Sequence, residues 1–429
     1  MEIILKGLRL LNPDQNLDLL SDVLIKDGII DKIENIDVSQ NSDAKVFDFS
    51  GKVCVPGLFD MHVHFREPGG EDKETVISGS NSAASGGFTG VACMPNTNPA
   101  IDSAEVVKFI IDRAKGHLVD VNPIGAVTKG RKGEGLAPML ELYDAGAVGF
   151  SDDGTAVKTA SLLRNALEYA KMIDSPIIEH CEDESLAGGS MNESVVSTEL
   201  GLPSIPTVAE DLVVMRGILL AEYTGGKIHI AHISSKRSVE LVREAKIRGV
   251  DVTAEAAPHH FTLTDECVRN FDTNYKMNPP LRQQKDVDAI IEGLQDGTID
   301  CIASDHAPHS IEDKELEYIY APNGIIGLET QLGLTLTELY HKGKLTLEQV
   351  VEKLALNPRK ILNLEIPQFE VGEKANFTIL DLDYEYKFDI KYSKSKSKNT
   401  PFNGRELKGK SIAVINNSKI YFDGQFQNI

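Results

Sequence analysis

The sequence predicts an α/β protein: a (β/α)8 barrel with a small β-domain formed from both ends of the chain. Strand-like apolar runs alternate with helical periodicity eight times between about residues 53 and 345, which is typical of a parallel sheet covered by helices. Eight repeats in a row favour a closed barrel over an open doubly wound sheet. The length of 429 residues exceeds that of one ordinary domain and leaves room for an addition to the barrel.

The predicted small β-domain takes residues 1–52 and 366–429. Short runs rich in β-branched residues occupy the first part and are separated by turns such as Asp27-Gly28. The second part has runs of the same kind, at 375–380 and 411–415. Because two strand-rich ends flank a different middle, we expect them to pair in one domain. The Ser/Lys run 393–398 is expected to be a small mobile loop.

Residues 53–365 form the predicted barrel. Its first strand is predicted over the apolar run 53–58, followed by a helix from Thr75 to Ala84 that ends at two glycines. The later strands are predicted over 91–94, 119–121, 147–150, 176–178, 227–230, 250–253 and 299–303. The later helices are predicted over 104–114, 139–143, 162–172, 208–223, 239–247, 287–294 and 328–339. Two long segments without a clear period, 187–206 and 310–327, are expected to act as lids.

Composition excludes some classes of function. The net charge of −21 argues against binding to nucleic acid or to an anionic membrane surface. The five cysteines are scattered and form no Cys-x-x-Cys pair, which predicts free thiols in a reducing compartment. The start of the chain lacks a basic region followed by a long apolar core, and no apolar run is long enough to span a membrane. We therefore expect a cytoplasmic protein.

Histidines and aspartates stand at the ends of five predicted strands. His62 and His64 lie two positions apart after the first strand, and alternate side chains of an extended strand share a face. The ends of the fourth, fifth, sixth and eighth strands carry Asp152, Asp153, His180, His232 and Asp305. Functional residues of a barrel gather at the carboxyl ends of its strands, so we expect these side chains to converge on one cavity. One such residue alone is more often a helix cap or a core histidine, but together they predict a hydrolytic site with one or two metal ions, best fitted by zinc.

Several longer motifs resemble those of a known family. The run DMHVHFREPG at 60–69 is similar to the signature of the cyclic amidohydrolases, and within them to that of the class I dihydroorotases. The same branch is resembled by the runs MPNTNP at 94–99, NPPLR at 278–282 and SDHAPH at 304–309. The resemblance extends over essentially the whole chain. It implies reversible hydrolysis of L-dihydroorotate to N-carbamoyl-L-aspartate, a step of pyrimidine biosynthesis, with one or two zinc ions per subunit.

The resemblance also implies roles for the residues at the strand ends. The implied metal ligands are His62, His64, His180, His232 and Asp305, and Asp305 is also the implied catalytic acid and base. Many relatives place a carboxylated lysine between two metals after the fourth strand, where this chain has no lysine. An aspartate takes that place in this branch: Asp153 is our choice and Asp152 the alternative, and the number of metal ions stays open.

The implied substrate carries a carboxylate, so its pocket needs hydrogen-bond donors. Arg66 follows His64 by two residues and could bind a carboxylate with both arms of its guanidinium, while the alternative is a surface salt bridge with Glu67. The resemblance adds three substrate-binding residues, Asn96, Asn278 and His309. His306 is assigned either to the surroundings of the metal site or to the structure, and the pair His259-His260 to a structural role.

Two other functions compete with this one. Another ring-opening enzyme, an allantoinase or a hydantoinase, would fit the metal ligands but not Arg66, the Asn96 motif or the absence of the lysine. A catalytically inactive relative that serves as a scaffold for an aspartate transcarbamoylase would be expected to lose metal histidines, and all four are present. The expected partners are the small-molecule substrate, a second copy of the chain in a homodimer, and an aspartate transcarbamoylase.

Overall fold

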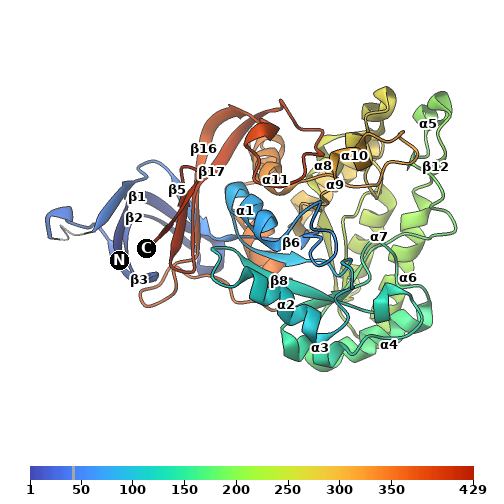
Figure 1. The fold of residues 1–429 in the computed structure, drawn as a ribbon, viewed down its shortest axis with the longest axis horizontal. Helices are drawn as coiled ribbons and strands as arrows, with labels where there is room; N and C mark the ends of the chain where they lie inside the picture. Colours follow the sequence, from blue (N-terminus) through green and yellow to red (C-terminus); the bar gives the residue numbers. More distant parts are fainter. Residues whose placement is uncertain (41–43) are drawn as a thin grey trace.

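A barrel of eight parallel strands forms the centre of the computed structural model, which describes residues 1–40 and 44–429 (Figure 1). Each strand pairs in parallel with the next one of the barrel along the chain. The barrel strands are β6 (Leu58–Val63), β7 (Phe88–Cys93), β8 (Asp120–Ala126), β9 (Gly149–Ser151), β10 (Ile177–Glu179), β13 (Ile228–Ile230), β14 (Val252–Ala256) and β15 (Cys301–Ile302). A parallel bridge between Val63 and His306 joins the two ends of this sheet, so the barrel is nearly closed. Its interior is packed with apolar side chains such as Phe59, Met61 and Ile178.

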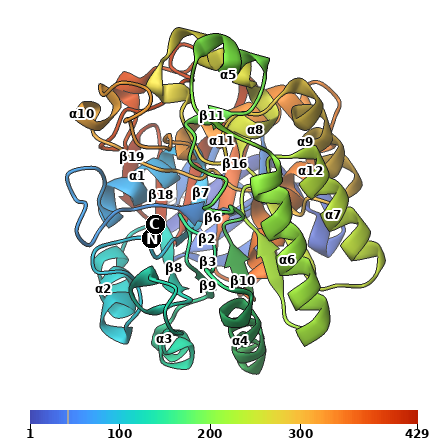
Figure 2. The ribbon, with the colours of Figure 1, turned by 90° about the vertical axis from the view of Figure 1, so that its right-hand side faces the viewer.

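Helices cover the outside of the barrel, as the alternating pattern predicts. They are α1 (Val76–Gly86), α2 (Ala104–Ala114), α3 (Met139–Ala145), α4 (Ala160–Ala170), α6 (Val208–Thr224), α7 (Lys236–Ile247), α9 (Gln284–Asp296) and α11 (Leu328–Thr335). Figure 2 shows several of them, α4, α6 and α7 among them, arranged around the strands. Among the described residues, no helix combines the length and the apolar character needed to cross a membrane.

Shorter elements fill the connections. They are α8 (Pro258–Thr262), α10 (Ile311–Lys314), α12 (Leu347–Val351) and α13 (Asn357–Ile361). The segment 187–206 was expected to lack regular structure, but it contains β11 (Met191–Asn192), α5 (Val195–Leu200) and β12 (Ser204–Ile205). The side chain of Asn192 stabilises this regular structure, because it donates to Asp265 (3.0 Å) and accepts from Arg282 (3.0 Å).

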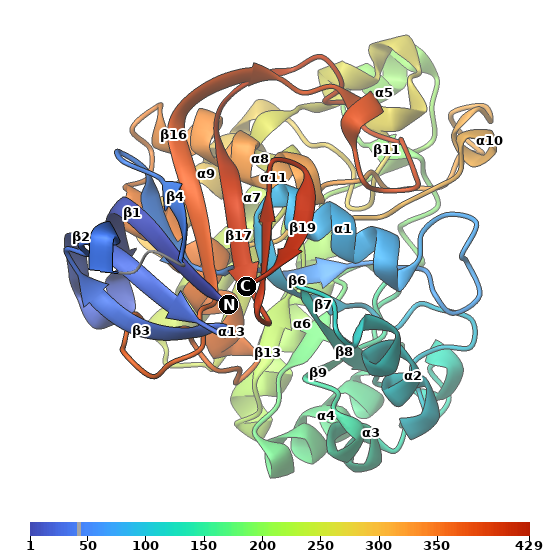
Figure 3. The same cartoon turned by 60° about the vertical axis from the view of Figure 1, so that its left-hand side comes forward.

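A nine-stranded mixed sheet combines both ends of the chain, as predicted (Figure 3). It contains β1 (Glu2–Asn12), β2 (Leu17–Lys26), β3 (Ile29–Glu34), β4 (Lys45–Asp48), β5 (Val53–Pro56), β16 (Phe377–Lys387), β17 (Glu406–Asn416), β18 (Lys419–Phe422) and β19 (Gln425–Asn428). The connection between the two ends of the chain is made through β5, which pairs with β1 in parallel and with β16 antiparallel. The division of the chain into 1–52, 53–365 and 366–429 stays a prediction.

The first barrel strand is not where the apolar run predicts it. Residues 53–56 form β5 of the mixed sheet, and the barrel strand β6 begins only at Leu58 and includes His62. Gly57 separates the two strands where the backbone lies very close to its neighbours: a Cβ at this position would lie 2.0 Å from Asn376 Oδ1. The chain passes from one sheet to the other at a residue that only glycine fits.

The Ser/Lys run 393–398 is also not the loose loop that its composition predicts. Ser395 and Ser397 are buried. The Ser395 hydroxyl and the Lys396 amide both donate to the carboxylate of Glu74, and the Ser397 hydroxyl donates to the Lys73 carbonyl (2.7 Å). Because Glu74 just precedes α1, these bonds fasten the carboxy-terminal part of the chain to the barrel.

Candidate metal and substrate site

The predicted ligand residues meet at the carboxyl ends of five barrel strands. His62 is near the end of β6 and His64 just beyond it, and the others follow β9, β10, β13 and β15. The side chains that come together are His62, His64, Asp153, His180, His232 and Asp305, and all six residues are buried.

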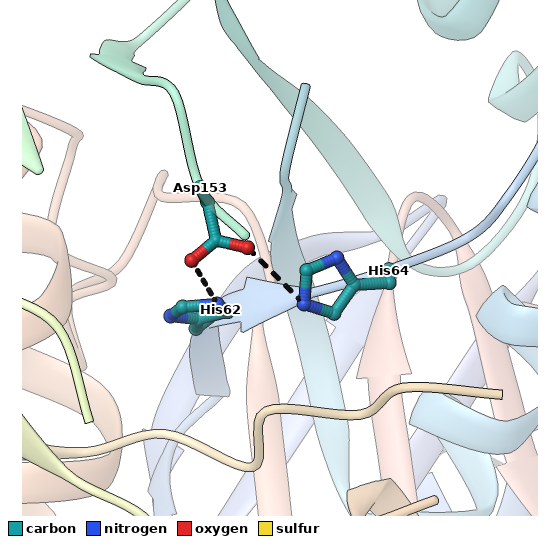
Figure 4. A group of neighbouring side chains, drawn as sticks. All are labelled: His62, His64 and Asp153. Atoms are coloured by element: carbon teal, nitrogen blue, oxygen red, sulfur yellow. Dashed lines mark ion pairs between the residues drawn. The ribbon is translucent and has the colours of Figure 1, made fainter. Parts of the chain in front are cut away.

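Asp153 lies between two groups of histidines. Its Oδ1 atom is 3.4 Å from His62 Nε2, and its Oδ2 atom is 3.6 Å from His64 Nε2 (Figure 4). The Oδ1 atom is also 3.6 Å from His180 Nδ1 and 3.6 Å from His232 Nε2. Two sets of potential ligands therefore share this one carboxylate: His62 and His64 on one side, and His180 and His232 on the other.

These atoms have the spacing and the unmet bonding capacity of a metal site. Two ligands of a tetrahedral zinc ion lie about 3.3 Å apart, given bonds near 2.0 Å. His62 Nε2 and Asp153 Oδ1 are buried and have no hydrogen-bond partner in the described part of the chain. Buried polar atoms without partners are costly, and a divalent cation would satisfy both. The residues present fit zinc.

The opposite charges of Asp153 and the histidines around it stabilise one another. Burial alone would lower the pKa of His62, but the carboxylates of Glu255 and Asp153 hold this pKa well above its usual value. Burial alone would raise the pKa of Asp153, but His62 and its other histidine neighbours hold it well below the usual range. The site therefore keeps its carboxylate ionised and compensates it with positive charge, a place that a bound cation would take.

Asp305 faces the same point from the end of the last strand. Its Oδ1 atom is 3.1 Å from His64 Nε2 and 3.7 Å from His62 Nε2. Burial acts to raise the pKa of Asp305, but the bond with His64 and the charge of His62 outweigh it and lower this pKa. Asp305 (φ 47°), His232 (φ 30°) and Arg66 (φ 62°) all have the left-handed backbone that side chains other than glycine rarely adopt. Such strain is concentrated at functional sites.

Asp152 points elsewhere than Asp153. Its carboxylate accepts from the backbone N–H of Thr128 (3.0 Å) and from the hydroxyl of the same residue (2.6 Å). These bonds fix the loop after β8. Asp152 is therefore engaged with backbone, and Asp153 alone of the pair faces the histidines.

Glu255 is part of the site but was not predicted. It lies in β14 with no exposed surface, and its Oε1 atom accepts from His62 Nδ1 (2.6 Å). This bond places the proton of the ring on Nδ1 and leaves Nε2 to face Asp153. Its other oxygen is 3.3 Å from His229 Nε2. The only available signal was a carboxylate within an apolar strand pattern, which needs a buried partner.

A cavity of about 190 Å³ opens over the metal-binding groups. It is lined by His64, Arg66, Asn96, Asp153, Gly154, His180, His232, Asn278, Asp305, Ala307, His309, Asn323 and Gly324. All four residues predicted to bind substrate are in this set. A larger hollow of about 1200 Å³ lies between α1, α11 and the mixed sheet, but no histidine lines it. The smaller cavity is therefore the one lined by the predicted metal-ligating and substrate-binding residues.

Arg66 does not pair with Glu67, the alternative that its sequence position allows. Glu67 accepts instead from Arg113 (2.8 Å) and from the backbone N–H of Val76 (2.8 Å). Arg66 donates to the Pro308 carbonyl (3.2 Å), and no carboxylate of the described residues lies within ion-pair distance of it. Burial lowers the pKa of Arg66 to about 10, which leaves the side chain charged at neutral pH. A cation without an anion therefore faces the cavity.

The other predicted substrate residues are held by specific partners. Asn96 Oδ1 accepts from His64 Nδ1 (2.8 Å), and Asn278 Nδ2 donates to Glu182 (3.0 Å). The Asn278 Oδ1 atom is buried and has no hydrogen-bond partner among residues 1–40 and 44–429. His309 Nε2 donates to the Asn323 carbonyl (2.7 Å), and burial, with the nearby charge of Arg66, lowers the pKa of His309 to about 3.

The remaining histidines of the motifs do not line the cavity. His306 Nδ1 accepts from the backbone N–H of Gly327 (3.1 Å), and its Nε2 atom lies 3.4 Å from Glu74. His260 Nε2 donates to the Pro279 carbonyl (3.0 Å). These bonds fix backbone segments around the site.

The fold is shared with solved structures of hydantoinases and dihydropyrimidinases. An L-hydantoinase from Arthrobacter aurescens has a TM-score of 0.87 with 27% identity, covering 100% of this chain and 97% of its own. A dihydropyrimidinase from Brevibacillus agri has a TM-score of 0.85 with 21% identity, covering 100% and 96%. Fold and site together define a hydrolase of the amidohydrolase superfamily, with buried His/Asp groups able to hold metal ions.

The sequences identify the family within that class. A profile described as "Dihydro-orotase-like" matches residues 51–238. A dihydroorotase from Pelotomaculum thermopropionicum is 52% identical over 417 residues, 97% of each chain. A dihydroorotase from Syntrophus aciditrophicus is 50% identical over 424 residues, 98% of this chain and 99% of its own. The chain belongs to the dihydroorotase family, and the prediction of a dihydroorotase is confirmed.

Proposed function

We propose that this chain interconverts L-dihydroorotate and N-carbamoyl-L-aspartate, with one or two zinc ions at the site described above. The observation that carries the proposal is the single carboxylate of Asp153 between two pairs of histidines. The proposed ligands are His62, His64, Asp153, His180, His232 and Asp305. When bound, zinc would lower the pKa of water and polarise the ring amide.

The chain's own groups would handle the proton. Asp305 stays ionised because its pKa is held below the usual range, so it can accept a proton from the attacking water. It can then deliver that proton to the ring nitrogen that leaves. In the reverse direction, the same carboxylate takes the proton from the nitrogen that closes the ring.

Substrate orientation would come from the wall of the cavity. The guanidinium of Arg66 has no anionic partner among the described residues and can bind the substrate carboxylate. Asn96 and His309 lie on the same cavity wall and would complete this contact. Asn278 Oδ1, which no described residue binds, can accept from an N–H of the ring amide.

The experiment is a turnover assay on zinc-loaded protein with dihydroorotate, allantoin and hydantoin. We expect turnover of dihydroorotate alone, lost in His62→Ala/His64→Ala together with bound zinc. The matched control is His341→Ala, an exposed histidine that donates to the Leu382 carbonyl and does not line the cavity. Turnover of another ring would overturn the substrate, and full zinc binding by the double variant would overturn the ligand set.

We also propose a homodimer, supported by an apolar stripe on α6. Val208, Leu212, Met215, Leu219 and Tyr223 recur every three or four residues and are 39–71% exposed. Figure 2 shows α6 on the outside of the barrel. Light scattering on Leu219→Glu should give a monomer, whereas Val371→Glu, an exposed apolar residue elsewhere, should not. Activity of the isolated chain would show that the proposed aspartate transcarbamoylase partner is dispensable.

A cytoplasmic location is proposed on the state of the cysteines. The five thiols are free, and four are buried. Such thiols are typical of proteins that remain in a reducing compartment.

A further inference from the structure

Two lysines are buried beside the substrate cavity. Lys276 is 5% exposed and Lys314 is 8% exposed. Buried lysines are rare, and those that occur are usually paired with carboxylates. Neither of these two has a carboxylate within ion-pair distance in the described part of the chain. Both side chains are instead directed at backbone carbonyls of one segment, 319–324.

The amino group of Lys314 is surrounded by three backbone carbonyls, two of them in this segment. It donates to Pro322 O (3.0 Å), to Gly324 O (3.0 Å) and, more weakly, to Lys276 O (3.4 Å). An ammonium has three N–H groups, and here each has an acceptor. The position is thus built for a hydrogen-bond donor that draws backbone together, and burial lowers the pKa of Lys314 to about 7.

Lys276 makes a second set of bonds to the same segment. Its ammonium donates to Ile319 O (2.8 Å) and to Ala321 O (2.7 Å). Its own carbonyl accepts from the backbone N–H of Gly324 (3.0 Å). The two lysines therefore join residue 276 to residues 319–324; we call this pair the lysine staple.

Both segments joined by the lysine staple reach the cavity. Asn323 lies between the two carbonyls that Lys314 binds, and its own carbonyl accepts from His309 Nε2 (2.7 Å). Asn323 and Gly324 line the cavity, and so does Asn278, two residues after Lys276. The staple therefore fixes the distance between two walls of the substrate cavity.

We propose that Lys314, assisted by Lys276, is a positioning residue for substrate binding. The hydrogen bonds of its Nζ atom hold residues 322–324 so that Asn323 and His309 meet the substrate, while the metal-binding groups below are not involved. The lysine staple rests on the function proposed above only in that the substrate enters this cavity.

The test compares Lys314→Met, which keeps the length of the side chain but not the charge, with Lys73→Met. Lys73 pairs with Asp313 (2.8 Å), next to Lys314, but none of its bonds reaches the carbonyls of 319–324. Lys314→Met should raise KM for dihydroorotate about 10-fold or more and change kcat less than about 3-fold, because uniform binding is lost. Its zinc content should be unchanged, and Lys73→Met should keep both constants within about 2-fold.

An unchanged KM in soluble, zinc-loaded Lys314→Met would overturn the role proposed for the lysine staple. An equal loss of kcat and of zinc would overturn it as well. If Lys314→Met does not fold, Lys276→Met gives the same test on the second lysine. Hydrogen exchange of residues 319–324 should become faster in either variant whatever ring the enzyme acts on. This measurement separates a failure of the staple from a failure of the proposed substrate.

Discussion

At the scale of single residues, the site depends on partners that stand behind the ligands. Glu255 accepts from His62 Nδ1 at 2.6 Å and is fully buried, so it sets which nitrogen faces Asp153. Asn96 does the same for His64 at 2.8 Å. Partners of this kind orient metal-binding histidines and increase their basicity.

We therefore expect Glu255→Gln to weaken zinc binding by about 10- to 100-fold, because the amide carries no charge to support His62. The measurement is competition for zinc against a chromophoric chelator. Glu244→Gln, on the exposed face of α7, is the control and should bind zinc like the unmodified protein. Equal zinc affinity of the two variants would contradict the role given to Glu255.

The sequence predicted the ligand residues and four further residues that line the cavity, but not Glu255 or the lysine pair behind them. His62, His180 and Asp305 follow strand patterns that are local in sequence, and the barrel topology alone brings them together. Glu255 acts through a residue 193 positions away, and Lys314 through carbonyls whose positions depend on the whole loop. Such long-range pairings produce no periodic pattern in the sequence.

At the scale of elements, the carboxy-terminal segment acts as a strap across α1 and α11. Glu74 accepts from Ser395 and Lys396, and Glu329 of α11 accepts from the backbone N–H of Lys394 (2.6 Å). The Ser/Lys composition of this segment predicts a mobile loop, because polar runs are seldom buried. The buried carboxylate of Glu74 and the half-buried carboxylate of Glu329 reverse that expectation by providing acceptors.

The strap predicts a pH dependence of stability. Burial raises the pKa of Glu329 to about 7, above the value of an unfolded glutamate. The folded state therefore binds the extra proton, and this contribution to stability is present below about pH 4.5 and is lost as the pH rises through about 7. Glu329→Gln should raise the free energy of unfolding at pH 8 by about 2 kcal/mol and leave it nearly unchanged at pH 4.

Urea denaturation at the two pH values measures this difference. Glu312→Gln, exposed on α10, is the matched control and should show no such change between the two conditions. A stabilisation of Glu329→Gln that is equal at pH 4 and pH 8 would contradict the assigned cause.

The order of elements was largely predictable, and the passage between sheets was not. Eight strand–helix repeats occur where the alternation of apolar runs predicts them, with boundaries shifted by a few residues. The run 53–58 is continuous in hydropathy although it contains the end of one strand and the start of another. Only the crowding at Gly57 separates β5 from β6, and that crowding comes from Asn376 and Thr89.

At the scale of the whole molecule, the mixed sheet and the barrel are tied by buried polar bonds. Thr378 of β16 is buried, donates to the Gly87 carbonyl (2.7 Å) just before β7 and accepts from the backbone N–H of Leu58 (3.1 Å) in β6. Asn416 of β17 donates to the Leu118 carbonyl (2.9 Å) beside β8. These contacts connect the two parts at the end of the barrel opposite the cavity.

Metal removal should therefore lower the stability of the entire chain. A ligand that binds only the folded state stabilises it, and the metal groups link five strands of the barrel. We expect chelation to lower the Tm of one cooperative transition by about 5 °C or more, and added zinc to restore it. Calorimetry that resolved two transitions, with only one responding to zinc, would contradict the coupling.

The position of Asp153 has a consequence for how the enzyme is made. A carboxylated lysine is assembled from dissolved carbon dioxide and is lost when that gas is scarce. An aspartate is complete when it leaves the ribosome. With Asp153 as the shared carboxylate, assembly of this centre would require only the folded chain and the cation. The supply of bicarbonate would therefore set no limit on the yield of active enzyme.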